Sequence, residues 1–488
     1  MFTPRLFVAA AFALAISQIV SSQAAKPVPK PAAQLDFQLA GAPLTADVSN
    51  ARTATMLREV KPQQIKASIA KLVDFYNRST ISSTETDLKP GTGVLAAADW
   101  VKAELDSYSK ACGGCLEVSF DESIEQPGPG NTRFAKSTPL KSVIAILRGA
   151  DPAAAKRMVL VAGHYDSRSS DVMDTHSFAP GANDDASGAA LTLEAARVMS
   201  KYRFPATIVF AVLTSEEQGL NGARHLAERA HKEGWQLEAV LNNDIVGGDT
   251  TPGDKLQSKL RVRVFSQGLD ASLPADQIRQ IISIGAENDT PSRQLARQIL
   301  AVGRTYMPQA IDPVMELRLD RFLRGGDHSA FSRVGFAAVR MSDWRENYDH
   351  QHANVRTENG KEYGDLLKFV DPEFAARVTR LNIATLATLA SSPGTPQHVR
   401  VDTSNLDNDT LLRWDPPTNF NQPVRYQIVW RETAANDWQF SADAAKYPGP
   451  SENSARMPIS KDNVFFGICA CTAQGACSQA VAPVPARD

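Results

Sequence analysis

Between residues 60 and 391, short apolar runs rich in β-branched residues alternate with longer stretches of helical periodicity. The apolar runs are SVIAIL, MVLVAG, ATIVFAVL, LEAVLNN, RVRVFS and FAAVRM. Helical spacing predicts helices over 62–77, 93–109, 186–200, 218–232, 291–306 and 372–391. Near-continuous apolar strands separated by helices are typical of a mostly parallel sheet with helices on both faces. The sequence therefore predicts an α/β domain over residues 61–391.

A second region begins where the composition changes, at SSPGTPQ in residues 391–397. Beyond it helical periodicity ends, and short segments of alternating polar and apolar residues recur between turns, as in an all-β sandwich. A tryptophan followed by DPP, the run YQIVWR and the run FFGICAC resemble a fibronectin type III module. We therefore predict a C-terminal all-β sandwich of this type over residues 395–488.

The N-terminus has the pattern of a secretory signal peptide. Arg5 precedes an apolar run from Leu6 to Val20, and small residues follow as far as Ala25. This pattern predicts a cleaved signal peptide over residues 1–25, with a retained membrane anchor as the alternative. The mature protein is then expected to be secreted or periplasmic. Residues 26–60 begin rich in proline and alanine and are predicted to form a linker or a pro-segment. We expect no other stretch to insert stably into a membrane, because none is long and apolar enough.

The charge balance restricts the binding partners of the chain, and its cysteine content predicts disulfides. The chain has 52 basic and 54 acidic side chains and a net charge of −2, so no global field favours nucleic acid or an acidic membrane. An exported chain can keep disulfides, and its five cysteines leave at least one unpaired. Cys112 and Cys115 in CGGC would close a local turn, the alternatives being a redox pair or half a zinc site. Cys471 and Cys477 lie across the expected hairpin CTAQGAC, and we predict a second disulfide there that leaves Cys469 free.

The segment PGANDDASG, residues 180–188, places Asp184 directly before Asp185. Adjacent carboxylates repel each other, and a helix-capping role accounts for only one of the two aspartates. An aspartate that precedes a helix accepts hydrogen bonds from the free N–H groups of its first turn. Cations bound beside Asp184 would offset the repulsion, and Asp185 could then keep the capping role.

Four predicted strands end in potential metal ligands or acid–base groups. In open parallel sheets, ligands bind at the carboxyl ends of the strands, so we expect these side chains at one edge of the sheet. Each motif alone has an ordinary explanation, such as a helix cap, but their joint placement does not. The candidates are His164 and Asp166 after MVLVAG, Glu216 and Glu217 after ATIVFAVL, Asp244 after LEAVLNN, and His350 and His352 after FAAVRM.

This mixture of nitrogen and oxygen donors suits zinc. A single zinc ion with an open position needs three protein ligands. Two zinc ions that share one carboxylate would use two histidines and three carboxylates, and the candidates then leave one glutamate for acid–base work.

The motifs HYDS, PGANDDASG, SEEQGLNGA, NNDIVG, GGDHSAF and HANVRT follow one another between residues 164 and 357. In this order the chain resembles secreted two-zinc aminopeptidases of the bacterial leucine aminopeptidase type, relatives of glutamate carboxypeptidase and the transferrin receptor. The resemblance implies a zinc exopeptidase fold with two Zn²⁺ per chain. It also implies a role for each motif residue: His164 and Asp244 on one zinc, Glu217 and His352 on the other, Asp184 as the bridge, Glu216 as general base and Asp166 as the partner that orients His164.

One departure from the family pattern leaves a ligand open. The last histidine of the family usually opens a motif of the type His-Thr-x-x-Asp-Thr, whereas this chain reads HANVRT and has Arg356 at the acidic position. His350 is therefore an alternative to His352. Asp327 and His328 in GGDHSAF are expected to line the pocket.

The resemblance implies removal of N-terminal residues from peptides with a free N-terminus, with the two zinc ions and Glu216 activating a water molecule. Carboxypeptidase or dipeptidase activity and glutaminyl cyclisation are alternatives on the same scaffold. A non-catalytic binding protein of the transferrin-receptor type is the alternative from another class, and the complete ligand set argues against it. The C-terminal module is expected to be a spacer, or to bind a surface, a polysaccharide or another protein.

Overall fold

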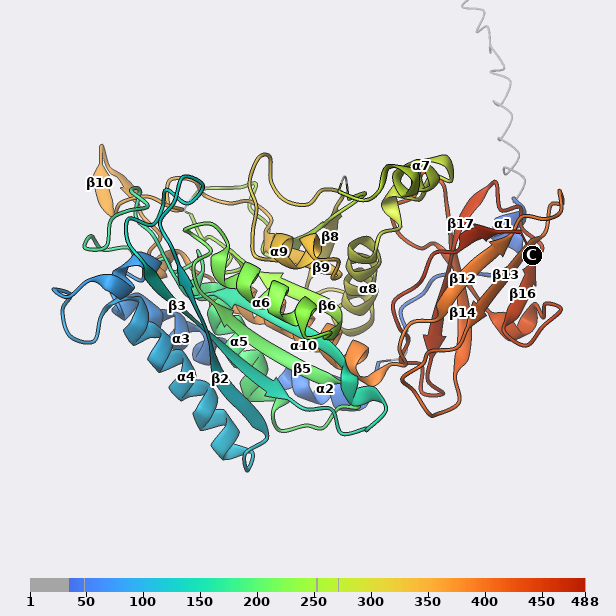
Figure 1. The fold of residues 1–488 in the computed structure, drawn as a ribbon, viewed down its shortest axis with the longest axis horizontal. Coiled ribbons are helices and arrows are strands. Elements are labelled where there is room, and N and C mark those ends of the chain that lie inside the picture. The colour runs from blue at the N-terminus through green and yellow to red at the C-terminus, as the bar shows by residue number, and fades with distance from the viewer. Residues whose placement is uncertain (1–34, 48, 252, 271, 488) are drawn as a thin grey trace, which may run out of the picture. The chain divides into compact units, whose positions relative to one another are not determined.

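An eight-stranded mixed sheet forms the centre of the α/β part in the computed structural model of this chain (Figure 1). Strands β5, β4, β6 and β9 are parallel neighbours, as predicted. Antiparallel pairings join β2 to β3, β3 to β5 and β7 to β9, so the sheet is mixed towards both edges. In order across the sheet the strands are β2 (Leu116–Glu125), β3 (Thr138–Leu147), β5 (Thr207–Leu213), β4 (Arg157–His164), β6 (Gln236–Asn243), β9 (Ala338–Asp343), β7 (Arg261–Ser266) and β8 (Asp312–Glu316).

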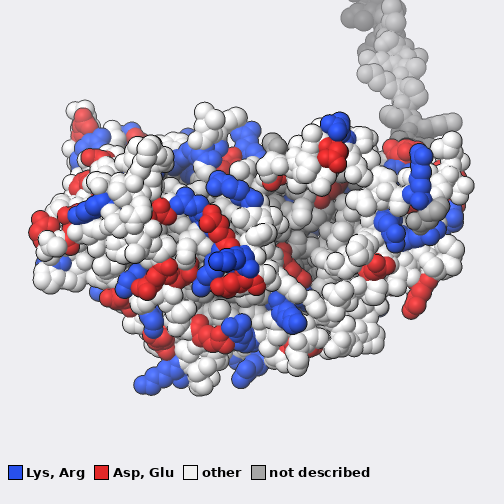
Figure 2. Space-filling view, viewed as in Figure 1, with Lys and Arg blue, Asp and Glu red and all other residues white. Residues whose placement is uncertain are grey.

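The structure describes residues 35–47, 49–251, 253–270 and 272–487. The predicted signal peptide, residues 1–25, lies outside these residues, as does the first part of the predicted linker. Within the described ranges, no helix combines the length and the apolar composition needed to cross a membrane. On the face shown in Figure 2, acidic and basic side chains are interspersed, in keeping with a net charge of −2.

Helices cover both faces of the sheet because successive residues of its strands point to opposite sides. Val159 and Val161 of β4 belong to the larger core, and Leu160 and Ala162 belong to the smaller one. The larger core includes α2 (Ala51–Arg58), α3 (Pro62–Asp74), α4 (Gly93–Ala111), α5 (Ala186–Met199), α8 (Pro291–Tyr306) and α10 (Pro372–Ser391). The smaller core includes α6 (Asn221–Lys232) and α9 (His328–Arg333). The predicted α/β architecture is confirmed.

Several short or exposed elements complete this part of the chain. Helix α7 (Ala275–Ser283) has no buried side chain. The strands β10 (Arg356–Glu358) and β11 (Lys361–Tyr363) form a hairpin. The 3₁₀ helices are η1 (Thr80–Thr84), η2 (Ala154–Lys156), η3 (Ala286–Asn288), η4 (Leu367–Phe369) and η5 (Ala444–Lys446).

Two four-stranded sheets make up the C-terminal part, which confirms the predicted all-β sandwich. Side chains of both sheets, among them Trp414, Ile428 and Trp430, share one core. The likeness to a fibronectin type III module stays a prediction. One sheet contains β16 (Ser454–Met457), β13 (Thr410–Asp415), β12 (Gln397–Asp402) and β18 (Val484–Ala486), and the other contains β1 (Ala42–Pro43), β15 (Phe440–Asp443), β14 (Arg425–Glu432) and β17 (Val464–Cys471).

The segment before the α/β part contributes to this sandwich. The short helix α1 (Asp36–Leu39) precedes β1, which pairs with β15. Phe37 is buried in the sandwich core at 4% exposure, and the indole N–H of Trp430 donates a hydrogen bond to its carbonyl oxygen at 2.8 Å. Residues 36–43, part of the segment 26–60 that was expected to be a linker or pro-segment, thus contribute to the C-terminal sandwich.

A buried ion network joins the sandwich to the α/β part. Asp289 lies just before α8, and its carboxylate accepts hydrogen bonds from Arg297 of α8 at 3.0 Å and from Arg431 of β14 at 2.9 Å. All three side chains are at most 2% exposed. Both guanidinium groups therefore depend on this one carboxylate for a buried negative charge.

The predicted disulfides are confirmed. Bonds join Cys112 to Cys115 and Cys471 to Cys477. Cys469 is free and buried, and burial raises the pKa of its thiol to about 12.

Candidate metal centre

The predicted site residues meet at the carboxyl ends of the parallel strands. His164 is the last residue of β4, Glu216 and Glu217 follow β5, and Asp244 follows β6. Because these strands are parallel neighbours, their carboxyl ends share one edge of the sheet. His352 reaches the same edge from the loop after β9.

Two groups of donor atoms form at this edge. One contains His164, Glu216 and Asp244, and the other contains Asp184, Glu217 and His352; within each group the donor atoms lie within 4.8 Å of one another. Asp184 links the two groups, because its Oδ1 lies 3.3 Å from Nε2 of His164 and its Oδ2 lies 2.9 Å from Nε2 of His352. A carboxylate that faces two histidines through different oxygens has the arrangement of a ligand shared by two cations.

Two of the donor atoms lack a hydrogen-bond partner within the described structure and are available to a metal ion. Nε2 of His164 and Oε1 of Glu217 are buried without a hydrogen-bond partner in the described structure. Nδ1 of His164 lies 3.2 Å from the backbone carbonyl of Asp166 and 3.4 Å from its Oδ1, so a proton on Nδ1 leaves Nε2 free to bind a metal. Imidazole and carboxylate donors of this kind fit zinc.

Asp166 also positions both glutamates. It is fully buried, and its Oδ1 and Oδ2 accept hydrogen bonds from the backbone N–H groups of Glu216 at 3.3 Å and Glu217 at 3.2 Å. One carboxylate therefore fixes the loop after β5 relative to His164.

Asp185 has a role different from that of Asp184. Its Oδ1 accepts a hydrogen bond from the N–H of Gly188 at 2.9 Å, which caps α5. Its Oδ2 accepts one from the N–H of His164 at 3.0 Å, and Oδ1 also accepts one from Ile245 at 3.2 Å. The predicted capping role is confirmed, and Asp185 in addition ties together the backbone of three segments of the centre.

Left-handed backbone occurs at three positions of this edge. Ser215, Ile245 and His352 have φ angles of 62°, 61° and 52°. Such angles cost free energy in residues other than glycine and gather at functional sites, where the surrounding structure holds them. They turn the chain sharply where it presents Glu216, Asp244 and the His352 ring.

Electrostatics favour a cation at this position. Although burial opposes it, the nearby imidazole rings of His164 and His352 hold the pKa of Asp184 well below its usual value. Burial also works against protonation of His352, but Glu217 and Asp184 raise its pKa to about 10. Burial, together with Asp244 and Glu217, raises the pKa of Glu216 well above its usual value. Protons thus balance the carboxylates when no metal is bound, and metal binding is expected to release them.

The structure separates the two candidate histidines of the last motif. His352 Nε2 lies 3.2 Å from Oε2 of Glu217 and faces Asp184. His350 instead lies against Asp249, with 2.6 Å between Nδ1 and Oδ2. Its ring stacks on Phe369 at a centroid distance of 3.7 Å. His350 therefore lies outside both donor groups.

The two residues expected to line the pocket are fully buried at the start of α9. Among the residues that the structure describes, Asp327 has no hydrogen-bond partner on either carboxylate oxygen, and burial raises its pKa to about 8. Nε2 of His328 lies 2.7 Å from the carbonyl oxygen of Leu319. Neither belongs to the donor groups, and His328 connects α9 to the loop after β8.

Three supporting residues of the centre were not identified from the sequence. Arg340 of β9 is fully buried and pairs with Asp244 at 3.0 Å. The carboxylate of Asp365 accepts hydrogen bonds from the backbone N–H of Asp184 at 2.7 Å and of Asn183 at 2.9 Å. Arg78, also fully buried, donates to the carbonyl oxygens of Tyr165, Leu72, Pro180 and Gly181. Arg340 could have been identified from the sequence, because it lies within the apolar run FAAVRM. A charged residue in a buried strand needs an oppositely charged partner.

A third group of possible metal donors lies at the surface. It contains Glu85, Asp87 and His176. Glu85 pairs with Lys136 at 3.4 Å, and Asp87 pairs with His176 at 3.2 Å. Ordinary ion pairs account for this group.

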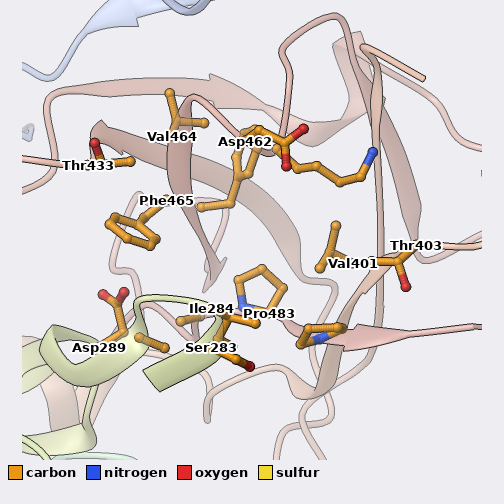
Figure 3. Close-up of a pocket in the computed structure, with 15 residues that line it drawn as sticks. Ser283, Ile284, Asp289, Val401, Thr403, Thr433, Asp462, Val464, Phe465 and Pro483 are labelled. Atoms are coloured by element: carbon orange, nitrogen blue, oxygen red, sulfur yellow. The ribbon is translucent and has the colours of Figure 1, made fainter. Parts of the chain in front are cut away.

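A cavity lies away from the donor groups, next to the C-terminal sheets. It has a volume of about 390 Å³ and also borders the end of α7 and η3. Ile284, Val401, Phe465 and Pro483 are among the side chains around it (Figure 3). Its lining includes none of the predicted site residues.

Comparison with known proteins gives concordant results. The pattern of the family described as Peptidase family M28 matches residues 142–369, the range that contains all the predicted ligands and Glu216. The chain is 40% identical over 434 residues to a probable zinc metalloprotease of Leptosphaeria maculans, covering 88% of this chain and 96% of that protein. It is 40% identical over 438 residues to a probable zinc metalloprotease of Pyrenophora teres f. teres, covering 88% of this chain and 86% of that protein. The crystal structure of Legionella pneumophila LapA has a similar fold, with a TM-score of 0.51 and 18% identity over 71% of this chain and 79% of that one.

Proposed function

Because this chain belongs to peptidase family M28 and is a zinc metallopeptidase, we propose that it is a secreted aminopeptidase that uses two zinc ions. The observation that carries the proposal is the position of Asp184, whose two oxygens face His164 and His352. In this proposal His164, Asp184 and Asp244 hold one zinc ion, and Asp184, Glu217 and His352 hold the other. Bound zinc would supply Lewis acidity that polarises the scissile carbonyl and acidifies a water molecule.

Glu216 is the proposed general base. It lies beside the ligand atoms of His164 and Asp244 but is not needed as a ligand in this assignment. Its carboxylate would take a proton from the attacking water and pass it to the amine that leaves. Asp166 holds the backbone N–H of Glu216 and would fix the direction of that transfer.

The excess of carboxylates supports exopeptidase rather than endopeptidase action. Asp184, Glu216, Glu217, Asp244 and Asp327 all lie at or beside the centre. Of these, Glu216 and Asp327 are not zinc ligands in the proposal and could accept hydrogen bonds from a free α-ammonium group, whereas an acylated N-terminus carries no charge to pair with them. Cleavage would then be confined to the N-terminal residue.

Export and domain organisation are part of the proposal. A signal peptide over residues 1–25 agrees with the two disulfides, since disulfides persist mainly outside the cytosol. Residues 61–391 would form the catalytic domain. Residues 395–488, together with Asp36–Pro43, would form an accessory β-domain that is free to bind a surface, a polysaccharide or another protein.

Aminoacyl-p-nitroanilides and their N-acetylated forms test the activity. The purified protein should hydrolyse the free forms and leave the acetylated forms intact, and a chelator should abolish hydrolysis until zinc is restored. Equal cleavage of acetylated substrates would contradict the aminopeptidase assignment. Release of a C-terminal residue from an acetylated peptide would identify a carboxypeptidase, and cyclisation of N-terminal glutamine would identify a glutaminyl cyclase.

A further inference from the structure

The loop between β8 and α9 carries an arginine that faces the metal centre. Nη1 of Arg324 donates a hydrogen bond to Oε1 of Gln351 at 3.3 Å, and Nε2 of Gln351 donates one to Oδ2 of Asp184 at 3.0 Å. One amide side chain therefore separates the guanidinium group from the carboxylate proposed to bridge the zinc ions.

The charge of Arg324 is loosely paired. Its ion pair with Glu346 is long, at 3.9 Å. Glu346 is already held by Arg263 at 2.5 Å and by Arg321 at 2.8 Å. Since Gln351 is neutral, the guanidinium group of Arg324 keeps donors and charge for a further partner.

Arg340 provides a contrast within the same centre. Its side chain is fully buried, and it pairs with Asp244 and with Asp320, each at 3.0 Å. Arg324 is instead 32% exposed. Arg340 is thus a structural cation, whereas Arg324 is accessible from the solvent side of the centre.

The loop around Arg324 is open to a ligand. Phe322 and Leu323 are exposed by 80% and 105%. Although burial opposes it, Glu346, Asp184 and Asp244 raise the pKa of Arg324. The side chain therefore stays charged at every pH at which a zinc peptidase works.

We propose that Arg324 binds a carboxylate of the peptide substrate and makes the enzyme favour substrates that carry a carboxylate close to the scissile bond. The inference rests on the proposed aminopeptidase function and extends it to specificity. Guanidinium and carboxylate groups form charge-assisted, often bidentate hydrogen bonds, so Arg324 would orient the substrate as well as attract it.

Two kinds of substrate carry a carboxylate close to the scissile bond. In one it is the side chain of an N-terminal aspartate or glutamate, and in the other it is the terminal carboxylate of a dipeptide. Both lie a few bonds from the carbonyl that would be cleaved. Glutamyl-p-nitroanilide compared with glutaminyl-p-nitroanilide tests the first kind, and Leu-Gly compared with Leu-Gly amide tests the second.

The test is the ratio of kcat/KM within each substrate pair, measured on zinc-loaded full-length protein. Arg324→Gln should lower the ratio of the charged to the neutral substrate on the order of 10- to 100-fold in at least one pair, the size expected for loss of a hydrogen bond to a charged group. Arg324→Lys, which keeps the charge but loses the planar fork, should lower the same ratio less. Arg318→Gln is the matched control, because its guanidinium group lies over the Phe322 ring at 4.0 Å, and it should leave both ratios unchanged.

The outcomes separate this inference from the proposed function. Unchanged ratios in both pairs for active Arg324→Gln protein would overturn the role of Arg324 and leave the aminopeptidase proposal standing. If Arg324→Gln is inactive on every substrate, the ratio for Arg324→Lys decides: a lowered ratio supports the role and an unchanged one overturns it. A wild-type protein that cleaves no N-terminally free substrate would instead refute the proposed function.

Discussion

Replacing Asp289 with asparagine should destabilise the protein far more than the same change in an exposed ion pair. Asp289 is the shared buried acceptor of Arg297 and Arg431, and all three side chains are at most 2% exposed. Burial already lowers the pKa of Arg297 to about 10 although Asp289 lies beside it. The substitution removes the negative charge and leaves two buried guanidinium groups without the carboxylate that pairs with both of them.

The expected magnitude follows from the burial. Breaking a buried ion pair by removing one partner costs about 3–5 kcal/mol, and Asp289→Asn affects two such pairs that share one carboxylate. Glu117 and Arg148 make an equally well-formed pair, with contacts of 2.9 Å and 2.7 Å, but their side chains are 57% and 58% exposed. Glu117→Gln should therefore cost at most about 1 kcal/mol.

Denaturant unfolding followed by tryptophan fluorescence measures both changes. Trp438 lies against Arg297 and Arg431, at 5.2 Å and 5.6 Å from its ring centroid, so its emission reports on this region. Equal loss of unfolding free energy in Asp289→Asn and Glu117→Gln would refute the argument that burial makes the network essential. Adding Arg431→Met to Asp289→Asn should recover part of the loss, because it removes one unpaired charge.

Three further predictions address catalysis, the N-terminal segment and the free thiol. Glu216→Gln should keep its zinc while kcat falls on the order of 10²- to 10⁴-fold, whereas Glu217→Gln should lose zinc. Metal analysis together with steady-state kinetics checks both variants. A near-normal kcat in Glu216→Gln would exclude Glu216 as the general base. Phe37→Ala should lower the unfolding free energy by about 3 kcal/mol, because Phe37 is 4% exposed in the sandwich core; unchanged stability on denaturant unfolding would show that the segment is dispensable. Cys469, whose pKa burial raises to about 12, should resist alkylation by iodoacetamide at pH 8 in native protein and react after unfolding; rapid native labelling detected by mass spectrometry would contradict its burial.

The strong periodic elements could be predicted from the sequence. The six predicted helices exist: those over 291–306 and 372–391 have the predicted boundaries, and the other four differ by one to three residues at one end. The helix predicted over 62–77 ends at Asp74 because Tyr76 has a left-handed φ of 70°, and no glycine announces that turn. Strand β2 was missed because it lies at an edge of the sheet, where its sequence LEVSFDESIE alternates polar and apolar residues rather than forming an apolar run.

Elements that depend on distant partners could not be predicted. Strand β1 has two residues, too few to show a period. It forms because it pairs with β15 and because Trp430 holds the preceding segment by a hydrogen bond. His164, Glu216, Glu217 and Asp244 could be predicted as site residues because each lies at or just after the end of a strand, and the carboxyl ends of parallel strands converge. Asp365 holds the backbone of Asp184 from 181 residues away, and nothing in its own surroundings in the sequence indicates that contact.

The number of zinc ions per chain tests the central claim most directly. Elemental analysis of the purified protein should find two zinc ions per chain, and Asp184→Asn should lower that number because Asp184 faces both histidines. Asp87→Asn is the control, since Asp87 belongs to the surface group with Glu85 and His176, and it should leave two zinc ions bound. A single zinc ion per chain that added zinc does not increase, or two zinc ions retained by Asp184→Asn, would contradict the account.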